Sequence, residues 1–199
     1  MKNFTKLLII SSLSINASAY ADQANKSKLK AQVNLGSVYT RLNNYNGAGY
    51  KVSAQVAFPL SQDNSLSKSK FDFYGKVSHQ SSKKKKQGNN FYFDENELSL
   101  GINYHINNKH RVFLEGGDIQ QTFDQNEKGL WKDYFYVARL GTQIKQGDYN
   151  VQFAIVHRNG IDSATGYNSN IGFFNNAIHI SYTEVGKYKS LVFSFQANF

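Results

Sequence analysis

The chain has 199 residues, a formal net charge of +9, no cysteine and 15% aromatic residues. The lack of cysteine excludes disulfides and thiolate metal ligands. No apolar run reaches the roughly 18 residues that a transmembrane helix needs, and the basic balance favours affinity for anions.

The N-terminal stretch has the pattern of a secretory signal peptide. Lys2 and Lys6 precede an apolar run at 7–15, and alanines follow at positions 17, 19 and 21. Cleavage fits after Ala19 or Ala21, and we favour Ala21. The sequence therefore predicts a signal peptide at 1–21 and one domain at 22–199, whose net charge is +7 because the leader carries two lysines and no acid.

Alternation of apolar and polar residues with a period of two follows, and this period indicates β-strands with one apolar face. A single proline in the whole chain is consistent with a strand-rich structure. The predicted strands are nine segments, at 28–42, 50–58, 71–79, 91–106, 110–123, 131–144, 149–160, 173–185 and 188–199.

Turn-forming or strongly polar residues separate these segments. The sequence predicts short turns at 43–49, 107–109, 145–148 and 186–187, and a polar connection at 59–70. It also predicts three longer loops, at 81–90, 124–130 and 161–172.

The last strand alternates without a break to the final side chain, so the C-terminus is predicted to be held in a sheet. Its apolar face carries Leu191, Phe193, Phe195, Ala197 and Phe199. A last strand that ends on an aromatic residue resembles that of bacterial outer-membrane β-barrels. In that class the barrel assembly machinery recognises such an end, so the resemblance implies that this stretch is an assembly signal.

Strands can cross a membrane only as a closed barrel, because only closure pairs every backbone group. Nine segments do not fit the even strand number of single-chain bacterial barrels. We therefore predict an all-β, up-and-down antiparallel transmembrane barrel of eight strands, with ten as the alternative. A soluble barrel has no such parity rule.

Alternation alone does not say whether the apolar face meets lipid or a soluble core. Aromatic residues near strand ends on that face favour lipid, because membrane barrels carry aromatic girdles at both interfaces. These residues are Tyr50, Tyr104, Tyr134, Tyr136, Tyr149 and Phe199.

A charged pair on the polar face also favours a membrane barrel. If loop 124–130 closes a symmetric hairpin, Glu115 lies opposite Arg139, and Gly101 on the other side of Glu115 leaves room for both long side chains. Such an interior ion pair resembles the charged interiors of the OmpA transmembrane domain and OmpX-like barrels. The alternative is an exposed pair on a soluble sheet, worth under ~1 kcal/mol.

A run of lysines at Lys83, Lys84, Lys85 and Lys86 lies in the predicted loop 81–90. It could bind the phosphates of lipopolysaccharide or another extracellular anionic partner, or it is simply a solvated loop tip. It lacks the interleaved aromatics and the motif context of a nucleic-acid site, so we expect no nucleic acid.

His179 and Ser181 face one way on a predicted strand, a His-x-Ser arrangement similar to that of outer-membrane lipid A deacylases. The resemblance covers these positions only, because Tyr182 stands where that family has asparagine and no carboxylate follows on the same face. A base without an orienting acid is a poor triad. The five histidines have no metal-ligand spacing, so we expect no metal and no cofactor.

These observations favour a non-enzymatic, exported protein of the Gram-negative cell outer membrane, in contact with outer-membrane lipid and lipopolysaccharide. An eight-stranded barrel is filled by its own side chains, which argues against a wide porin-like diffusion pore. The predicted role is to present loops 81–90, 124–130 and 161–172 for surface interaction or adhesion, or to support envelope integrity. The alternatives are a secreted, soluble barrel that carries a ligand and a lipid A-modifying hydrolase.

Overall fold

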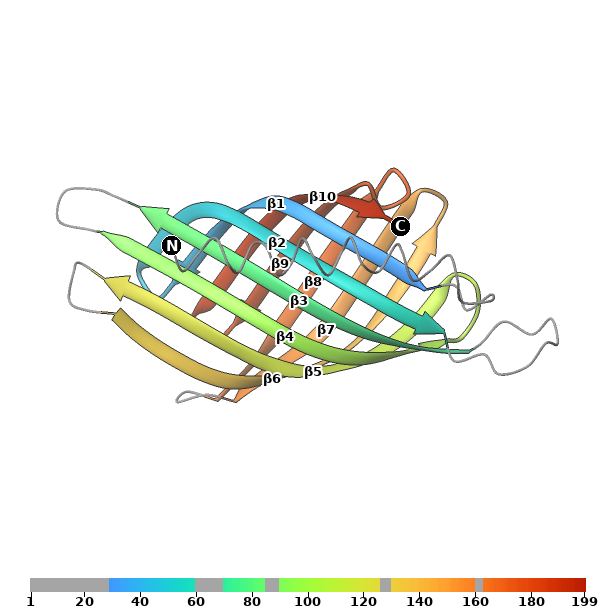
Figure 1. Ribbon diagram of the computed structural model, residues 1–199, viewed down its shortest axis with the longest axis horizontal. Coiled ribbons are helices and arrows are strands. Elements are labelled where there is room, and N and C mark those ends of the chain that lie inside the picture. Colours follow the sequence, from blue (N-terminus) through green and yellow to red (C-terminus); the bar gives the residue numbers. More distant parts are fainter. Residues whose placement is uncertain (1–28, 60–69, 85–89, 126–129, 160–162) are drawn as a thin grey trace.

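The computed structural model describes residues 29–59, 70–84, 90–125, 130–159 and 163–199. Within these ranges the chain forms ten antiparallel strands that close into an up-and-down barrel (Figure 1). The predicted signal peptide at 1–21 lies outside the described residues. The strands are β1 (Lys30–Leu42), β2 (Tyr45–Pro59), β3 (Phe71–Lys84), β4 (Phe91–His105), β5 (His110–Gln125), β6 (Leu130–Gln146), β7 (Tyr149–Asn159), β8 (Ala164–Phe173), β9 (Ile178–Val185) and β10 (Tyr188–Asn198).

The all-β antiparallel barrel is confirmed, but the preferred count of eight strands is wrong and the alternative of ten is right. The error lies in one region. The predicted loop 161–172 is mostly strand β8, and the predicted strand 173–185 is a turn at 174–177 followed by β9. Three consecutive residues of that turn, Phe174, Asn175 and Asn176, have positive φ, a conformation that asparagine tolerates better than most residues.

Two other predicted boundaries are also wrong, at one end of the barrel. The predicted turn 43–49 is only the pair 43–44, and the predicted loop 81–90 begins later, because β3 continues to Lys84. Gly49 explains how β2 runs through this stretch: a Cβ there would clash with the backbone of Ser81 on β3. The glycine is therefore a site of close strand approach and not of a turn.

The barrel closes between its first and last strands, with Leu35 of β1 opposite Phe195 of β10. Backbone hydrogen bonds join Ala31 and Phe199 in both directions, at 3.1 and 2.9 Å. The C-terminal residue is thus held in the sheet. We call the end of the barrel that carries Ala31 and Phe199 the terminal end. We call the opposite end, with the turns 43–44 and 186–187, the far end.

The outside of the barrel is apolar and the inside is polar. Leu100 on β4 is 70% exposed and Phe195 on β10 is 59% exposed, whereas Glu115 on β5 is only 5% exposed. The alternative of a soluble carrier requires the apolar face inside the barrel. The observed orientation is the opposite, so this alternative is wrong. In the ranges that the structure describes, no helix has the length and apolarity to cross a membrane.

The two ends of the barrel differ. Strands β5 and β6 have 16 and 17 residues, whereas β9 has 8, and Figure 1 shows β3 to β6 extending farthest at the far end. Apolar side chains fill the interior there in two clusters. The clusters are Phe91, Phe93 and Tyr188, packed with Leu42, Tyr45 and Phe123, and Ile119, Phe135, Val137, Val156 and Val185, packed with Ala164. We call them together the far-end plug.

Candidate functional site in the barrel lumen

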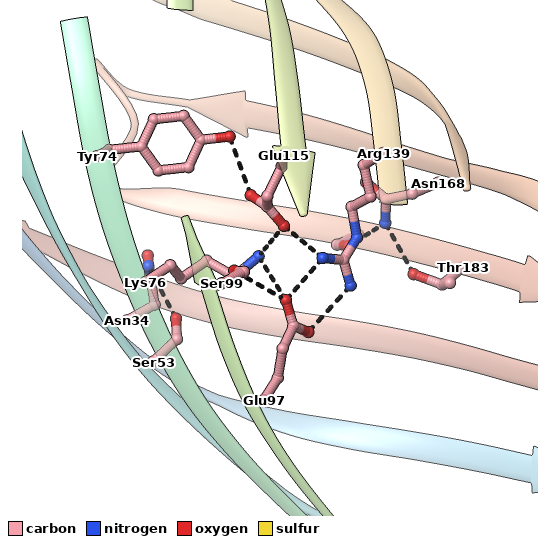
Figure 2. A network of polar contacts seen from close by, with 11 residues as sticks. Asn34, Ser53, Tyr74, Lys76, Glu97, Ser99, Glu115, Arg139, Asn168 and Thr183 are labelled. Atoms are coloured by element: carbon pink, nitrogen blue, oxygen red, sulfur yellow. Dashed lines mark hydrogen bonds and ion pairs between the residues drawn. The ribbon is translucent and has the colours of Figure 1, made fainter. Parts of the chain in front are cut away.

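Glu115 and Arg139, the pair expected from the sequence, lie opposite one another on β5 and β6 and point into the barrel. The Arg139 guanidinium contacts the Glu115 carboxylate and also binds Glu97 on β4 through two nitrogens, at 2.6 and 2.9 Å (Figure 2). This bidentate geometry is the strong form of an arginine–carboxylate interaction. Arg139 therefore links three neighbouring strands.

Lys76 on β3 completes the arrangement. Its Nζ lies 3.1 Å from Glu97 Oε1 and 2.9 Å from Glu115 Oε1, so that two acids and two bases neutralise each other. Ser99 donates to Glu97 at 3.2 Å, and the Tyr74 hydroxyl donates to Glu115 at 3.0 Å. We call these residues the central charge cluster: Tyr74, Lys76, Glu97, Ser99, Glu115 and Arg139.

The space beside Gly101 is used differently from what the sequence suggested. Gly101 does lie opposite Glu115, but the ring of Tyr74 occupies the position where a Cβ of Gly101 would stand. The missing side chain therefore makes room for a tyrosine, which brings its hydroxyl to Glu115. Lys76 and Glu97 were not identified from the sequence as members of the central charge cluster. Both lie in the middle of their strands, at positions that the alternation assigns to the polar face.

A second polar group lies between the central charge cluster and the far-end plug. Arg158 Nη1 on β7 is 3.4 Å from Glu95 Oε2 on β4, and Gln121 Nε2 donates to the same oxygen at 2.6 Å. The Arg158 guanidinium also lies over the ring of Tyr188, 4.2 Å from its centroid. A cation above an aromatic face is stabilised by the ring quadrupole, so Arg158 connects the charges to the plug.

A cavity of about 340 Å³ occupies the rest of the lumen. It runs from Glu95 and Tyr188 near the far-end plug to Gln32 and Asn198 at the terminal end. Amide side chains from β1, β2, β4, β6, β7, β8 and β10 line it, together with members of the central charge cluster. The amides are Gln32, Asn34, Gln55, Asn103, Gln143, Asn150, Gln152, Asn168, Asn170, Gln196 and Asn198, joined by Asn176 of the turn 174–177.

The lysine run does not form a loop cluster in the part that the structure describes. Lys83 and Lys84 are the last residues of β3; Lys83 lies over the ring of Tyr92, and Lys84 Nζ donates to Asn46 at 2.9 Å. Successive strand residues face opposite ways, so these two lysines do not share a face. Lys85 and Lys86 lie outside the described residues.

The C-terminal stretch expected to act as an assembly signal faces outward from the barrel. Phe199 is 71% exposed, and the alternate residues before it on β10 are exposed as well. Their exposure leaves this row of apolar side chains accessible along the first–last strand seam. The outward-facing residues are Leu191, Phe193, Phe195, Ala197 and Phe199.

His179 and Ser181 both line the lumen cavity. The neighbour of the imidazole is an amide, with Asn170 Oδ1 3.1 Å from His179 Nδ1, and Asn168 donates to the Ser181 hydroxyl at 3.3 Å. A nucleophile activated by a triad needs a carboxylate or an equivalent orienting group behind the base. Among the described residues, no group of three or more histidine, aspartate or glutamate side chains could hold a metal ion.

No protein-family model and no curated protein matches this chain. Solved structures resemble it, and they are bacterial outer-membrane β-barrels. The translocator domain of the autotransporter NalP from Neisseria meningitidis is 8% identical, over 100% of this chain and 97% of that one, with a TM-score of 0.48. Neisserial surface protein A is 10% identical over 85% and 95% of the two chains (TM-score 0.41), and Ail of Yersinia pestis is 11% identical over 85% and 98% (TM-score 0.40). Likenesses of this size carry no argument about function.

Proposed function

We propose that the protein is a non-enzymatic barrel of the Gram-negative outer membrane, exported by a signal peptide at 1–21. The observation that carries the proposal is the outer surface, where large apolar side chains are exposed around the whole barrel. Soluble monomers rarely expose an apolar patch larger than a few hundred Å². Representative members from five strands are Leu35, Leu100, Leu140, Ile155 and Phe193. We call this surface the apolar belt.

Aromatic residues border the apolar belt on both sides. Such paired girdles are typical of membrane barrels, because amphipathic rings are favoured at the two headgroup layers. Towards the far end the exposed aromatics include Tyr39, Tyr50, Tyr134, Tyr136 and Tyr167; towards the terminal end they include Phe58, Phe71, Tyr104, Tyr149 and Phe199.

At the level of the far-end girdle, where Asp118 and Gln120 lie opposite Tyr136 and Tyr134, the outward face of β4 and β5 becomes polar. On β4, Leu98 is followed towards the far end by Asn96 and Asp94, and on β5, Gly116 is followed by Asp118 and Gln120. A transmembrane strand needs about 9–11 residues, so strands of 15 to 17 residues extend past the hydrocarbon. This supports a surface role carried by projecting strand ends.

The interior supports the same conclusion. The far-end plug and the central charge cluster fill much of the lumen, which is unsuited to a wide diffusion pore. We propose that the far-end rim contacts lipopolysaccharide or another extracellular partner, with the exposed Lys83 available to phosphate groups. The contribution of the barrel to envelope integrity would come through these same contacts.

The membrane assignment predicts two measurable properties. Unboiled protein should migrate differently from boiled protein on a detergent gel, because a closed barrel resists unfolding in detergent. The protein should also remain in the pellet after carbonate washing and ultracentrifugation of cell envelopes. Soluble protein in the carbonate supernatant would refute the proposal.

Phe199 provides a test of assembly by the barrel assembly machinery. We expect Phe199→Ala to reduce the amount of protein inserted in the outer membrane several-fold, while refolding of the purified variant in detergent is unchanged. The matched control is Tyr149→Ala, because Tyr149 is also an exposed aromatic at the terminal end. Equal insertion of the two variants would contradict a recognition role for Phe199.

A further inference from the structure

We infer that the lumen cavity binds a small hydroxylated organic anion, that is, a sugar-like molecule with one carboxylate or phosphate group. This goes beyond a structural role for the barrel in the membrane. The inference rests on the charge balance of the cavity, the chemistry of its amide lining and its closure at one end.

The charges that line the cavity do not balance. The described residues contribute five cations to its wall but only three carboxylates, which leaves an excess of two positive charges. Lys76 and Arg139 are paired with Glu97 and Glu115 in the central charge cluster, and Arg158 is paired with Glu95. The remaining cations are Lys51 and Arg111.

Lys51 and Arg111 face the cavity from β2 and β5. Neither side chain has a hydrogen bond or an ion pair with any of the residues that the structure describes. Glu95 and Glu97 act on Lys51 only through longer-range attraction, as Asp72 does on Arg111. An arginine in a partly closed site favours an oxyanion, because its planar fork matches the geometry of carboxylate and phosphate.

A continuous row of amides extends from Arg111 on one side, and His105 lies opposite Arg111 on the other. Arg111 lies opposite Gln143, Gln143 opposite Gln152, and Gln152 opposite Asn170, so that the row crosses β5, β6, β7 and β8 in register. Each amide offers donors and an acceptor, and hydroxyl groups can use both. A simple inorganic anion would use only the donors, which is why we assign a ligand with hydroxyl groups as well as a negative charge.

The shape of the cavity favours a binding site over a free passage. A volume of about 340 Å³ is at the lower end of the roughly 300–1,000 Å³ typical of small-molecule sites. The far-end plug covers one side, whereas Gln32 and Asn198 line the cavity beside the terminal end. The ligand would therefore enter from the terminal end.

The test is isothermal titration of the barrel, refolded in detergent, with gluconate, glucose 6-phosphate, glucose and acetate. We expect one or both sugar anions to bind at least about tenfold more tightly than glucose and acetate, because only they combine charge with hydroxyls. Arg111→Gln should weaken that binding at least about tenfold, the range expected for losing a charged hydrogen bond. Lys132→Gln is the matched control, because Lys132 is an exposed cation on β6 outside the cavity.

Four results would overturn the inference: no heat of binding for either anion, glucose or acetate binding as tightly as the sugar anions, no effect of Arg111→Gln, or an equal effect of Lys132→Gln. The first would mean that the cavity holds only water. A difference between the two sugar anions would identify the carboxylate or the phosphate as the preferred group. Each variant is first shown to be folded by the gel shift, so a failure of binding would leave the membrane assignment intact.

Discussion

Replacing Arg139 by alanine is expected to lower the free energy of unfolding by about 3–5 kcal/mol, the usual cost of removing one partner from a buried ion pair. The loss leaves Glu97 and Glu115 together with only Lys76 to neutralise them. Their side chains are only 2% and 5% exposed, so water in the lumen hydrates the two carboxylates less well than bulk solvent would and does not fully replace the guanidinium. The measurement is urea unfolding in lipid vesicles, followed by the gel shift.

Two further variants identify the cause. Arg41→Ala removes an exposed arginine whose side chain, among the described residues, donates only to the backbone of Asn43, and we expect a change within about 0.5 kcal/mol. Adding Glu97→Gln to Arg139→Ala should recover about 1 kcal/mol, because it removes one of the two repelling charges. A loss no larger for Arg139→Ala than for Arg41→Ala would show that the central charge cluster does not stabilise the barrel.

The sequence could predict one pair of this cluster because one hairpin is nearly symmetric about its connection. The expected loop 124–130 has the same centre as the last observed pair of this hairpin, Asp124 opposite Leu130, so Glu115 meets Arg139. The register of the β3–β4 hairpin could not be predicted in this way, because the lysine-rich end of β3 resembles a loop. Polar residues there are compatible with a strand, since β3 continues past the apolar belt into water.

Strand β8 shows why the count was wrong. Its inward positions carry Gly166, Asn168, Asn170 and Gly172, and Ser169 interrupts its outward face. Asparagine, serine and glycine are also the residues of turns, and a polar lumen allows them inside a strand. In a barrel with an apolar outside, only the outward positions carry a strong strand signal, and β8 has few of them.

The amide lining of the cavity follows from the same physics. One or two inward positions on each of seven strands supply it, and these come together only when the barrel closes with a defined register. Arg111 and Gln143, for example, are 32 positions apart in the sequence but lie opposite one another. Neither residue type is unusual alone, so no local pattern could have indicated the site.

Replacing Leu100 by lysine is the second large change we expect, with a loss of about 2–4 kcal/mol in lipid vesicles, as for charges at the bilayer midplane of membrane barrels. Leu100 lies in the apolar belt between Leu98 and Ile102, opposite Gly116 on β5. The side chain is 70% exposed, so in a water-soluble barrel the same substitution would change stability by no more than about 0.5 kcal/mol. The sign and size of the effect therefore report on the solvent around the belt.

Thr122→Lys is the matched control for this measurement. Thr122 faces outward on β5, beyond Asp118 and Gln120, with Asp94 opposite it on β4 and Lys132 opposite it on β6. There we expect aqueous surroundings and a cost near zero, because attraction to Asp94 offsets repulsion from Lys132. Urea titrations of both variants in phosphatidylcholine vesicles give the comparison. If the two lysines prove equally tolerated, the apolar belt does not contact hydrocarbon and the barrel is not a membrane protein. A loss of unfolding free energy confined to Leu100→Lys requires nonpolar surroundings next to Leu100.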